Sequence, residues 1–222
     1  MLRIAIITGS TRPGRIVEGV ARWALNVAAQ RSDARFELVD IADFNLPLLD
    51  EPLPPSLGHY KHDHTKAWAA SIASYDGFIF VTPEYNHSMS GALKNAIDFI
   101  YAEWNNKAAG FVSYGSTGGV RAVEQLRLVM AEIKIADVRS HVSLSLFTDF
   151  ENYSVFKPQA RHAAELNALL GEVIAWATAL RTVRVAKGRF RSAARITPSG
   201  DIRRARSIAL RSSRTLPGQL CW

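Results

Sequence analysis

Apolar residues occur along the chain in short continuous runs that alternate with longer amphipathic stretches. Such runs indicate strands of a buried sheet, and an apolar stripe at helical spacing indicates a helix packed on that sheet. The pattern predicts five strands and five helices. The expected strands are residues 2–8, 36–40, 76–83, 108–114 and 137–147, and the expected helices are residues 15–30, 64–75, 90–104, 120–134 and 160–180.

Regular alternation of strands and helices predicts an α/β fold. Parallel neighbours need a return connection of roughly a dozen residues or more, so we expect a five-stranded parallel sheet with helices on both faces, a three-layer sandwich. In such a sheet ligands bind beyond the carboxyl ends of the strands, where the strand order reverses. We therefore expect the functional residues in the turns after the first, third and fourth strands.

The distribution of charge separates a body from a tail. Residues 181–222 contain 11 Lys and Arg against one acidic residue, which leaves 16 basic and 19 acidic residues in 1–180, a net charge of −3. The overall charge of +7 thus belongs to the tail. We predict an α/β domain over residues 1–185 and a basic, disordered extension over 186–222. The tail has few aromatic residues and scattered Gly and Pro, which argues against nucleic-acid binding.

The sequence has no pattern of a membrane or secreted protein. No run approaches the roughly 18 to 20 consecutive apolar residues of a membrane span, and the N-terminus lacks the basic-then-apolar pattern of a signal peptide. The single cysteine, Cys221, cannot form an intrachain disulfide, which agrees with a reducing compartment. We expect a soluble, cytoplasmic protein.

The turn after the first strand, GSTRPGR, has the composition of an anion site. Gly9 permits a sharp exit from the strand, and the start of the next helix presents unpaired N–H groups and a positive dipole end. Ser10 adds a hydroxyl, and Arg12 and Arg15 add forked donors that suit a phosphate. The P-loop Lys-Ser/Thr pair and the Gly-x-Gly-x-x-Gly spacing are absent, so the turn indicates one terminal phosphate. A polar turn with two solvated arginines is the alternative.

The turn after the third strand, TPEYNHSMSG, offers groups that suit a flat ligand. Pro83 stiffens the exit from the strand, while Tyr85 and Asn86 present an aromatic face and an amide. Taken alone, Tyr85 could cap the edge of the sheet and Glu84 could be a solvated acid.

The turn after the fourth strand, SYGSTGGVRA, contains three glycines and three small hydroxyl residues, which let the backbone approach a ligand closely. Loops also need glycine for conformation alone, so this turn is informative only together with the other two at the same sheet edge. A phosphate cradle and two loops for a planar ring describe a mononucleotide. FMN is the mononucleotide whose large tricyclic ring needs two flanking loops.

Three segments, GSTRPGR, VTPEYNHSMSGALKNAIDFIYAEW and GFVSYGSTGGVRAVEQLR, resemble in this order the NADPH-dependent FMN reductase family, over approximately residues 2–180. The resemblance implies a flavodoxin-like fold and a reductase that uses FMN and NADPH. It also implies FMN-binding residues for the phosphate, for the ring and for its pyrimidine side. These are Ser10, Arg12 and Arg15 for the phosphate, Pro83, Glu84, Tyr85 and Asn86 for the ring, and Ser116, Gly118 and Gly119 for its pyrimidine side.

The resemblance further implies a ping-pong cycle in which NADPH gives a hydride to the flavin and leaves before a small acceptor, such as a quinone, an azo compound or free flavin, takes its place. No catalytic side chain is then required, and backbone N–H groups of Gly118 and Gly119 would stabilise negative charge near N1 and O2. Family members are usually homodimers or homotetramers. An FMN-binding electron carrier that does not oxidise NADPH is the alternative, although such carriers are often strongly acidic for docking and this body is not.

The segment HYKHDH, residues 59–64, combines three imidazoles with a carboxylate, a composition that metal sites also use. It follows a proline-rich loop and opens a helix, and no second group of ligands accompanies it. We therefore predict no metal site.

Overall fold

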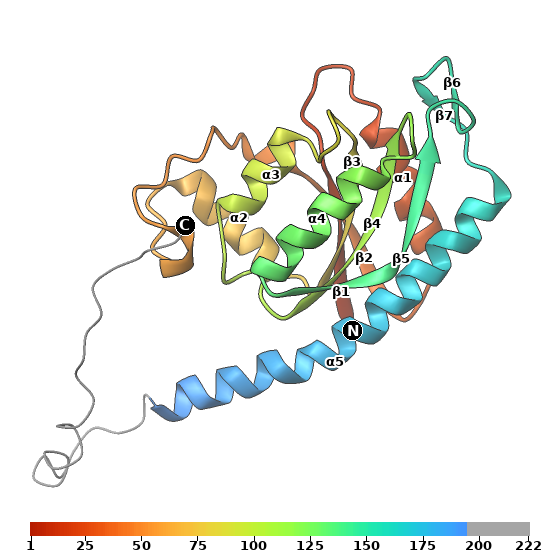
Figure 1. The fold of residues 1–222 in the computed structure, drawn as a ribbon. Helices are drawn as coiled ribbons and strands as arrows, with labels where there is room; N and C mark the ends of the chain where they lie inside the picture. The colour runs from red at the N-terminus through yellow and green to blue at the C-terminus, as the bar shows by residue number, and fades with distance from the viewer. Residues whose placement is uncertain (195–222) are drawn as a thin grey trace, which may run out of the picture. The chain divides into compact units, whose positions relative to one another are not determined.

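Five parallel strands form the central sheet of the computed structural model, which describes residues 1–194 (Figure 1). Their spatial order, β2-β1-β3-β4-β5, is that of flavodoxin-like doubly wound folds. The strands are β1 (Leu2–Thr8), β2 (Ala34–Asp40), β3 (Gly77–Pro83), β4 (Lys107–Gly115) and β5 (Ile135–Ser145). β3 and β4 are buried along their whole length, as expected for central strands of a parallel sheet, and β4 buries the polar residues Lys107 and Ser113 among its apolar ones. The predicted five-stranded parallel fold is confirmed.

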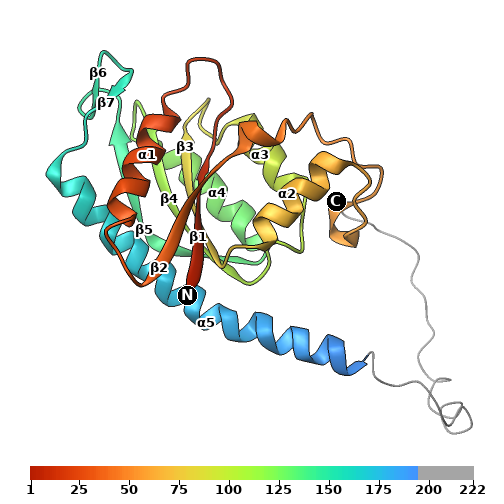
Figure 2. The same cartoon turned by 180° about the vertical axis from the view of Figure 1, so that it is seen from behind.

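Helices cover both faces of this sheet and complete the three layers (Figure 1, Figure 2). α1 and the first part of α5 pack on one face, and α2, α3 and α4 pack on the other. The helices are α1 (Val17–Ala28), α2 (Asp63–Ala73), α3 (Gly91–Asp98), α4 (Val120–Glu132) and α5 (Ala160–Ala194).

The core under α2, α3 and α4 is largely aromatic. The Trp104 ring lies 4.9 Å from the Phe78 ring and 5.9 Å from the Trp68 ring, both near edge-to-face. The indole N–H groups are also paired, because Trp68 donates to Ala96 O at 2.7 Å and Trp104 donates to Ile97 O at 3.1 Å. Since both acceptors belong to α3, the tryptophans fix this helix against the sheet and so fix the loop that precedes it.

Several elements differ from their predicted extent. α3 ends at Asp98 and not at residue 104, because residues 101–106 form turns that return Trp104 to the core. Two 3₁₀ helices, η1 (Ile41–Phe44) and η2 (Pro55–Leu57), lie in the proline-broken stretch. A hairpin of two short antiparallel strands, β6 (Phe150–Glu151) and β7 (Val155–Phe156), follows β5 and was not predicted.

α5 is longer than the predicted helix, which ended at residue 180. It continues to Ala194, so the extension predicted from residue 186 begins as helix, and the rest of that extension, residues 195–222, lies outside the described residues. Residues 1–183 form one compact unit. The boundary after residue 185 stays a prediction.

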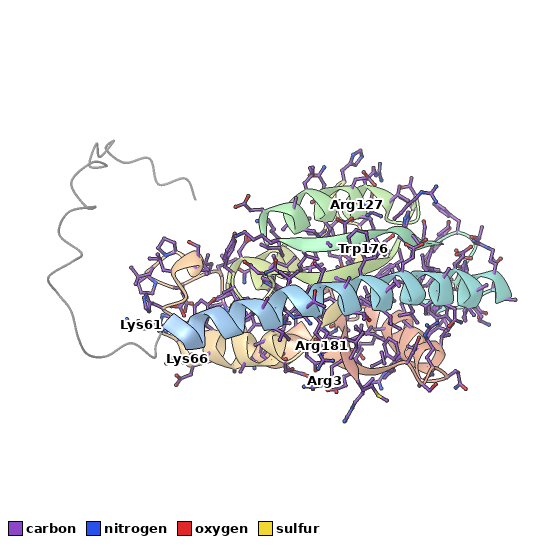
Figure 3. All side chains as sticks on the ribbon, turned by 90° about the horizontal axis from the view of Figure 1, so that it is seen from below. Arg3, Lys61, Lys66, Arg127, Trp176 and Arg181 are labelled. Carbon is purple, nitrogen blue, oxygen red and sulfur yellow. The ribbon has the colours of Figure 1, made fainter. Side chains whose placement is uncertain are left out.

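By length and composition alone, α5 could cross a membrane over Ala160–Ala186. Its inner face, however, carries the buried side chains of Leu166, Leu169 and Val173, which belong to the core with α1 and the sheet. Trp176, which follows on the same helix, is exposed (Figure 3). A helix with one buried and one exposed side is typical of helices that pack on a sheet.

Candidate functional site

Three loops meet at the carboxyl ends of β1, β3 and β4, the edge at which we expected a ligand (Figure 1). Gly9 N–H donates to Val81 O at 2.7 Å, and Ser90 Oγ donates to Gly9 O at 2.5 Å, which fastens the β1–α1 loop to β3 and to the β3–α3 loop. Glu84 N–H donates to Tyr114 O at 3.0 Å and joins the β3–α3 loop to β4. The protein's own hydrogen bonds thus hold the three loops in one frame.

The β1–α1 loop presents the donors that a phosphate requires. A Cβ on Gly9 would lie 2.8 Å from Val81 O, so only glycine allows the strand to pass so close. Ser10 is buried, and its Oγ accepts the Arg12 N–H at 3.4 Å. Ile16, the N-cap of α1, provides no side-chain cap, which leaves the first N–H groups of the helix for an anion. The Arg12 side chain is exposed, with no salt bridge to any described residue.

Arg15 makes its hydrogen bonds within the protein. Its guanidinium forms a bidentate pair with Asp40, at 2.9 and 2.5 Å, and donates to Ser10 O at 2.5 Å. Burial would raise the pKa of Asp40, but hydrogen bonds from Arg15 and from the Ala42 N–H outweigh burial, and the pKa lies below its usual range. Arg15 is therefore engaged within the protein and holds the loop in shape, whereas Arg12 forms no ion pair with a described residue; that these two arginines bind a phosphate stays a prediction.

The β3–α3 loop contains a tight turn at its tip. Tyr85 and Ser88 exchange backbone hydrogen bonds at 2.9 and 3.1 Å, and the two central residues, Asn86 and His87, have φ of +50° and +69°, as in a type I′ turn. Positive φ is uncommon outside glycine and clusters at functional sites. Asn86 is exposed, and the Tyr85 hydroxyl lies 3.3 Å from Ser10 Oγ. The Tyr85 hydroxyl thus connects this turn with the β1–α1 loop.

Pro83 and the Glu84 side chain hold the loops of the site in place. Pro83 is the buried last residue of β3. The Glu84 carboxylate accepts the Arg121 N–H at 3.1 Å and Arg121 Nε at 2.5 Å, and it forms a salt bridge with Nη2. Arg121 Nη1 also donates to His87 Nε2 at 2.7 Å. Glu84 therefore caps α4, whose N-cap Gly119 has no side chain, and links the two ring loops.

The β4–α4 loop turns through Gly118 and Gly119, whose φ values are +73° and +75°. A Cβ on Gly118 would overlap Ser143 Oγ, and a Cβ on Gly119 would lie 2.7 Å from Tyr114 N, so both positions require glycine. Ser116 is exposed at the tip of the loop and makes no hydrogen bond with a described residue.

Sequence reasoning missed three residues of the site: Asp40, Tyr114 and Arg121. Tyr114 is buried at the end of β4, and both burial and the nearby Tyr85 raise the pKa of its hydroxyl, while positive charge on Arg12 acts in the opposite direction. Its hydroxyl therefore lies within electrostatic range of the first two loops. Strand register would have indicated Tyr114, because it pairs with Pro83 across β3 and β4.

The histidines of residues 59–64 form a local cluster. His62 and His64 stack with ring centroids 5.2 Å apart, and His64 Nε2 lies 3.0 Å from Asp50 Oδ1. Within residues 1–194, no group of three or more His, Cys, Asp or Glu side chains is arranged to hold a metal ion.

The residues present fit FMN. One end of the frame offers Arg12, Ser10 and an uncapped helix start, a donor set for a phosphate. The other end offers a glycine turn at positions 118 and 119 that packs directly on β4 and β5, where any Cβ would collide with Ser143 or Tyr114, so that backbone groups form the edge of the frame. The exposed side of Tyr85 lies between these ends.

Comparison with known proteins supports the same assignment. The family model for NADPH-dependent FMN reductase matches residues 2–149. The NAD(P)H-dependent FMN reductase ntnL of Nectria sp. is 42% identical over 159 residues, which cover 67% of this chain and 79% of that protein. The 2-hydroxy-1,4-benzoquinone reductase of Burkholderia sp. is 33% identical over 141 residues, with 60% and 73% coverage.

A solved structure agrees in fold. The flavoenzyme NAD(P)H:(acceptor) oxidoreductase FerB from Paracoccus denitrificans matches 80% of this chain and 98% of its own, with a TM-score of 0.63 and 20% sequence identity. The matched family segment includes all three loops of the site. It confirms the predicted oxidoreductase class and the expected use of FMN and NADPH. The chain belongs to the NADPH-dependent FMN reductase family.

Proposed function

We propose that this protein is an FMN-dependent oxidoreductase that takes hydride from NADPH and reduces a small acceptor in a ping-pong cycle. The observation that carries the proposal is the frame of three loops, with phosphate donors at one end and a glycine turn at the other. The names of its relatives, an FMN reductase and a benzoquinone reductase, support free flavin and quinones as acceptors. Azo compounds are a third class with the same planar, electron-poor character.

FMN supplies the ring that accepts and donates hydride, and the chain's own residues bind and orient it. Arg12, Ser10 and the first N–H groups of α1 would hold the phosphate. Tyr85 and Asn86 would line the ring, while Arg15 supports the loop from within. A site that takes NADPH and then the acceptor in the same place would give the ping-pong order.

We also expect a homodimer or homotetramer that works in the cytoplasm, with no nucleic-acid partner. The oligomeric state follows from the family resemblance, and light scattering on the purified protein measures it directly.

The first test is an anaerobic titration of the FMN-loaded protein with NADPH, followed by absorbance. Fast bleaching of the protein-bound flavin band supports the reductase. A bound flavin that stays yellow would assign the protein to the electron carriers, and failure to bind flavin would refute the site.

A second test addresses the phosphate end. Arg12→Ala should weaken FMN binding by roughly tenfold, since an exposed charge-assisted hydrogen bond contributes about 1.5 kcal/mol, and it should alter the rate of the loaded enzyme far less. Arg22→Ala, an exposed arginine in α1, is the matched control. Equal FMN affinity in the Arg12 variant and the wild type would reject the phosphate role.

A further inference from the structure

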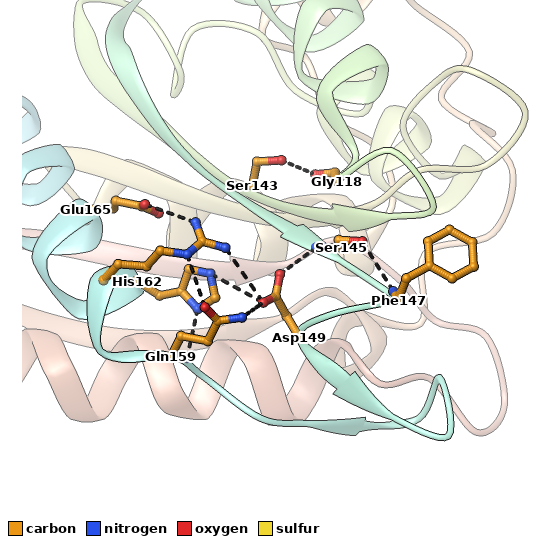
Figure 4. Close-up of polar contacts among 9 residues, drawn as sticks. Gly118, Ser143, Ser145, Phe147, Asp149, Gln159, His162 and Glu165 are labelled. Carbon is orange, nitrogen blue, oxygen red and sulfur yellow. Dashed lines mark hydrogen bonds and ion pairs between the residues drawn. The ribbon is translucent and has the colours of Figure 1, made fainter.

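Two serine hydroxyls hold the carbonyl oxygen of Gly118. Ser113 Oγ donates to it at 2.7 Å and Ser143 Oγ donates to it at 3.0 Å; Figure 4 shows the second bond. Ser113 is fully buried near the end of β4, and Ser143 is half-buried near the end of β5. Two neighbouring strands of the sheet therefore fix the orientation of one peptide plane in the β4–α4 loop.

The direction of this carbonyl determines the direction of the next N–H group. A trans peptide is planar, with its C=O and N–H on opposite sides, and residues 1–194 contain no cis peptide bond. Because Gly118 O is directed at the two serines, the Gly119 N–H points away from them. No described residue accepts a hydrogen bond from it. Gly115 also leaves this N–H uncovered, since a Cβ there would lie 3.3 Å from Gly119 N.

Without these serines the peptide between Gly118 and Gly119 would have little preference for one orientation. Gly118 and Gly119 both have positive φ and no side chain, so sterics alone allow the peptide between them to adopt more than one orientation. The two hydroxyl bonds select one orientation before any ligand arrives. A donor that is already aligned stabilises a developing charge without reorganisation, which is the condition under which such donors contribute most.

We propose that Ser113 and Ser143 are positioning residues that aim the Gly119 N–H at the negative charge of reduced flavin. The inference rests on the proposed function, because it requires FMN in the frame of three loops. Reduced flavin carries more negative charge at its pyrimidine edge than oxidised flavin does. A fixed donor at that edge therefore favours the reduced form and raises the reduction potential of the bound cofactor.

The test is the midpoint potential of bound FMN, measured by dithionite titration in the wild type, in Ser113→Ala, in Ser143→Ala and in the double variant. We expect the double variant to bind reduced FMN about tenfold more weakly relative to oxidised FMN, which lowers the two-electron midpoint by about 30 mV. Ser143→Thr keeps the hydroxyl and should restore the wild-type potential. Ser140→Ala is the matched control in β5: it loses a bond to Glu172 Oε1 at 2.5 Å, and its potential should not change.

An unchanged potential in the FMN-loaded double variant would overturn the proposal. So would an equal loss of affinity for both oxidation states, because it would show a structural role only. If Ser113→Ala does not fold, Ser143→Ala tests the proposal alone, because Ser143 is only half-buried. About half of the shift in midpoint potential is expected in that variant. A wild type that holds FMN without oxidising NADPH would refute the reductase function, whereas the dithionite titration would still decide the role of the serines.

Discussion

The two partners of the ion pair between Glu84 and Arg121 should differ in how much stability is lost when each is removed. The Glu84 side chain is 5% exposed, whereas the Arg121 side chain is 38% exposed. Removal of Arg121 leaves a nearly buried carboxylate without its cation, but removal of Glu84 leaves a guanidinium that water can reach. We therefore expect Arg121→Ala to destabilise the fold more than Glu84→Ala does, although both delete the same pair.

The magnitudes follow from the contacts. Glu84→Ala removes the cap of α4, which contributes about 1 kcal/mol, and an ion pair that is partly open to solvent, which contributes about 1 kcal/mol more. Arg121→Ala retains the cap, because the backbone N–H at position 121 still reaches the carboxylate. This variant leaves the Glu84 carboxylate without its cation, and breaking a buried ion pair in this way costs about 3–5 kcal/mol of stability. Because Arg121 is partly exposed, we expect Arg121→Ala to lose about 3 kcal/mol of stability. The double variant has no unpaired charge and should lose about 2 kcal/mol, as Glu84→Ala alone does.

Urea unfolding of the two single variants and the double variant, all without FMN, gives the three free energies. The double variant should be more stable than Arg121→Ala, with a Tm higher by about 2–4 °C, the shift expected for about 1 kcal/mol in a domain of this size. Lys94→Ala is the control: its pair with Asp98 at 2.6 Å is exposed on both sides and should contribute less than about 0.5 kcal/mol. Additive losses, or a larger loss in Glu84→Ala, would refute the reasoning from burial.

Three further outcomes are expected. Gly118→Ala should lose FMN binding and at least about 2 kcal/mol of stability, since its φ is +73° and the new Cβ would overlap Ser143 Oγ; wild-type FMN affinity in that variant would show that the turn can move. Buried His162 accepts the Gln159 N–H at 3.0 Å, and burial lowers its pKa below the ordinary 6.5 (Figure 4). The contribution of neutral His162 to stability is therefore complete above about pH 6.5 and is lost as the pH falls. The Tm should thus drop more between pH 7 and pH 5 in the wild type than in His162→Gln. Equal drops in the two proteins would contradict this account. A chain that ends at Ala186 should retain FMN and its reduction by NADPH, and loss of FMN would assign the tail a role in the site.

The strands could be predicted from the sequence because a strand covered on both faces has to be apolar throughout. The ends of helices were harder to predict. Trp104 continues the apolar stripe of α3 and thus suggested a longer helix, but it enters the core from a turn, which periodicity cannot distinguish from another helical turn. The β6 and β7 strands have two residues each, too few for any alternation to show.

The loops of the site could also be located from the sequence, because the carboxyl edge of a parallel sheet is a general binding position. The directions of individual side chains could not. Glu84 lies in the segment that suggested ring contact, yet its carboxylate is paired with Arg121, 37 residues later. Arg15 suggested a phosphate ligand, yet its partner Asp40 ends the neighbouring strand. Such pairs depend on strand order and register, which spacing along one chain does not contain.

The two halves of the β4–α4 loop differ in which side chains they can accept. Ser116 and Thr117 are exposed at its tip and make no hydrogen bonds with described residues, while the two glycines after them are confined by strands beneath. Random libraries limited to positions 116 and 117 should therefore yield folded proteins at high frequency, and their flavin content would measure what the Ser116 side chain contributes to FMN binding. The next two positions would reject almost every replacement, so one half of this four-residue turn accepts varied side chains while the other half requires glycine.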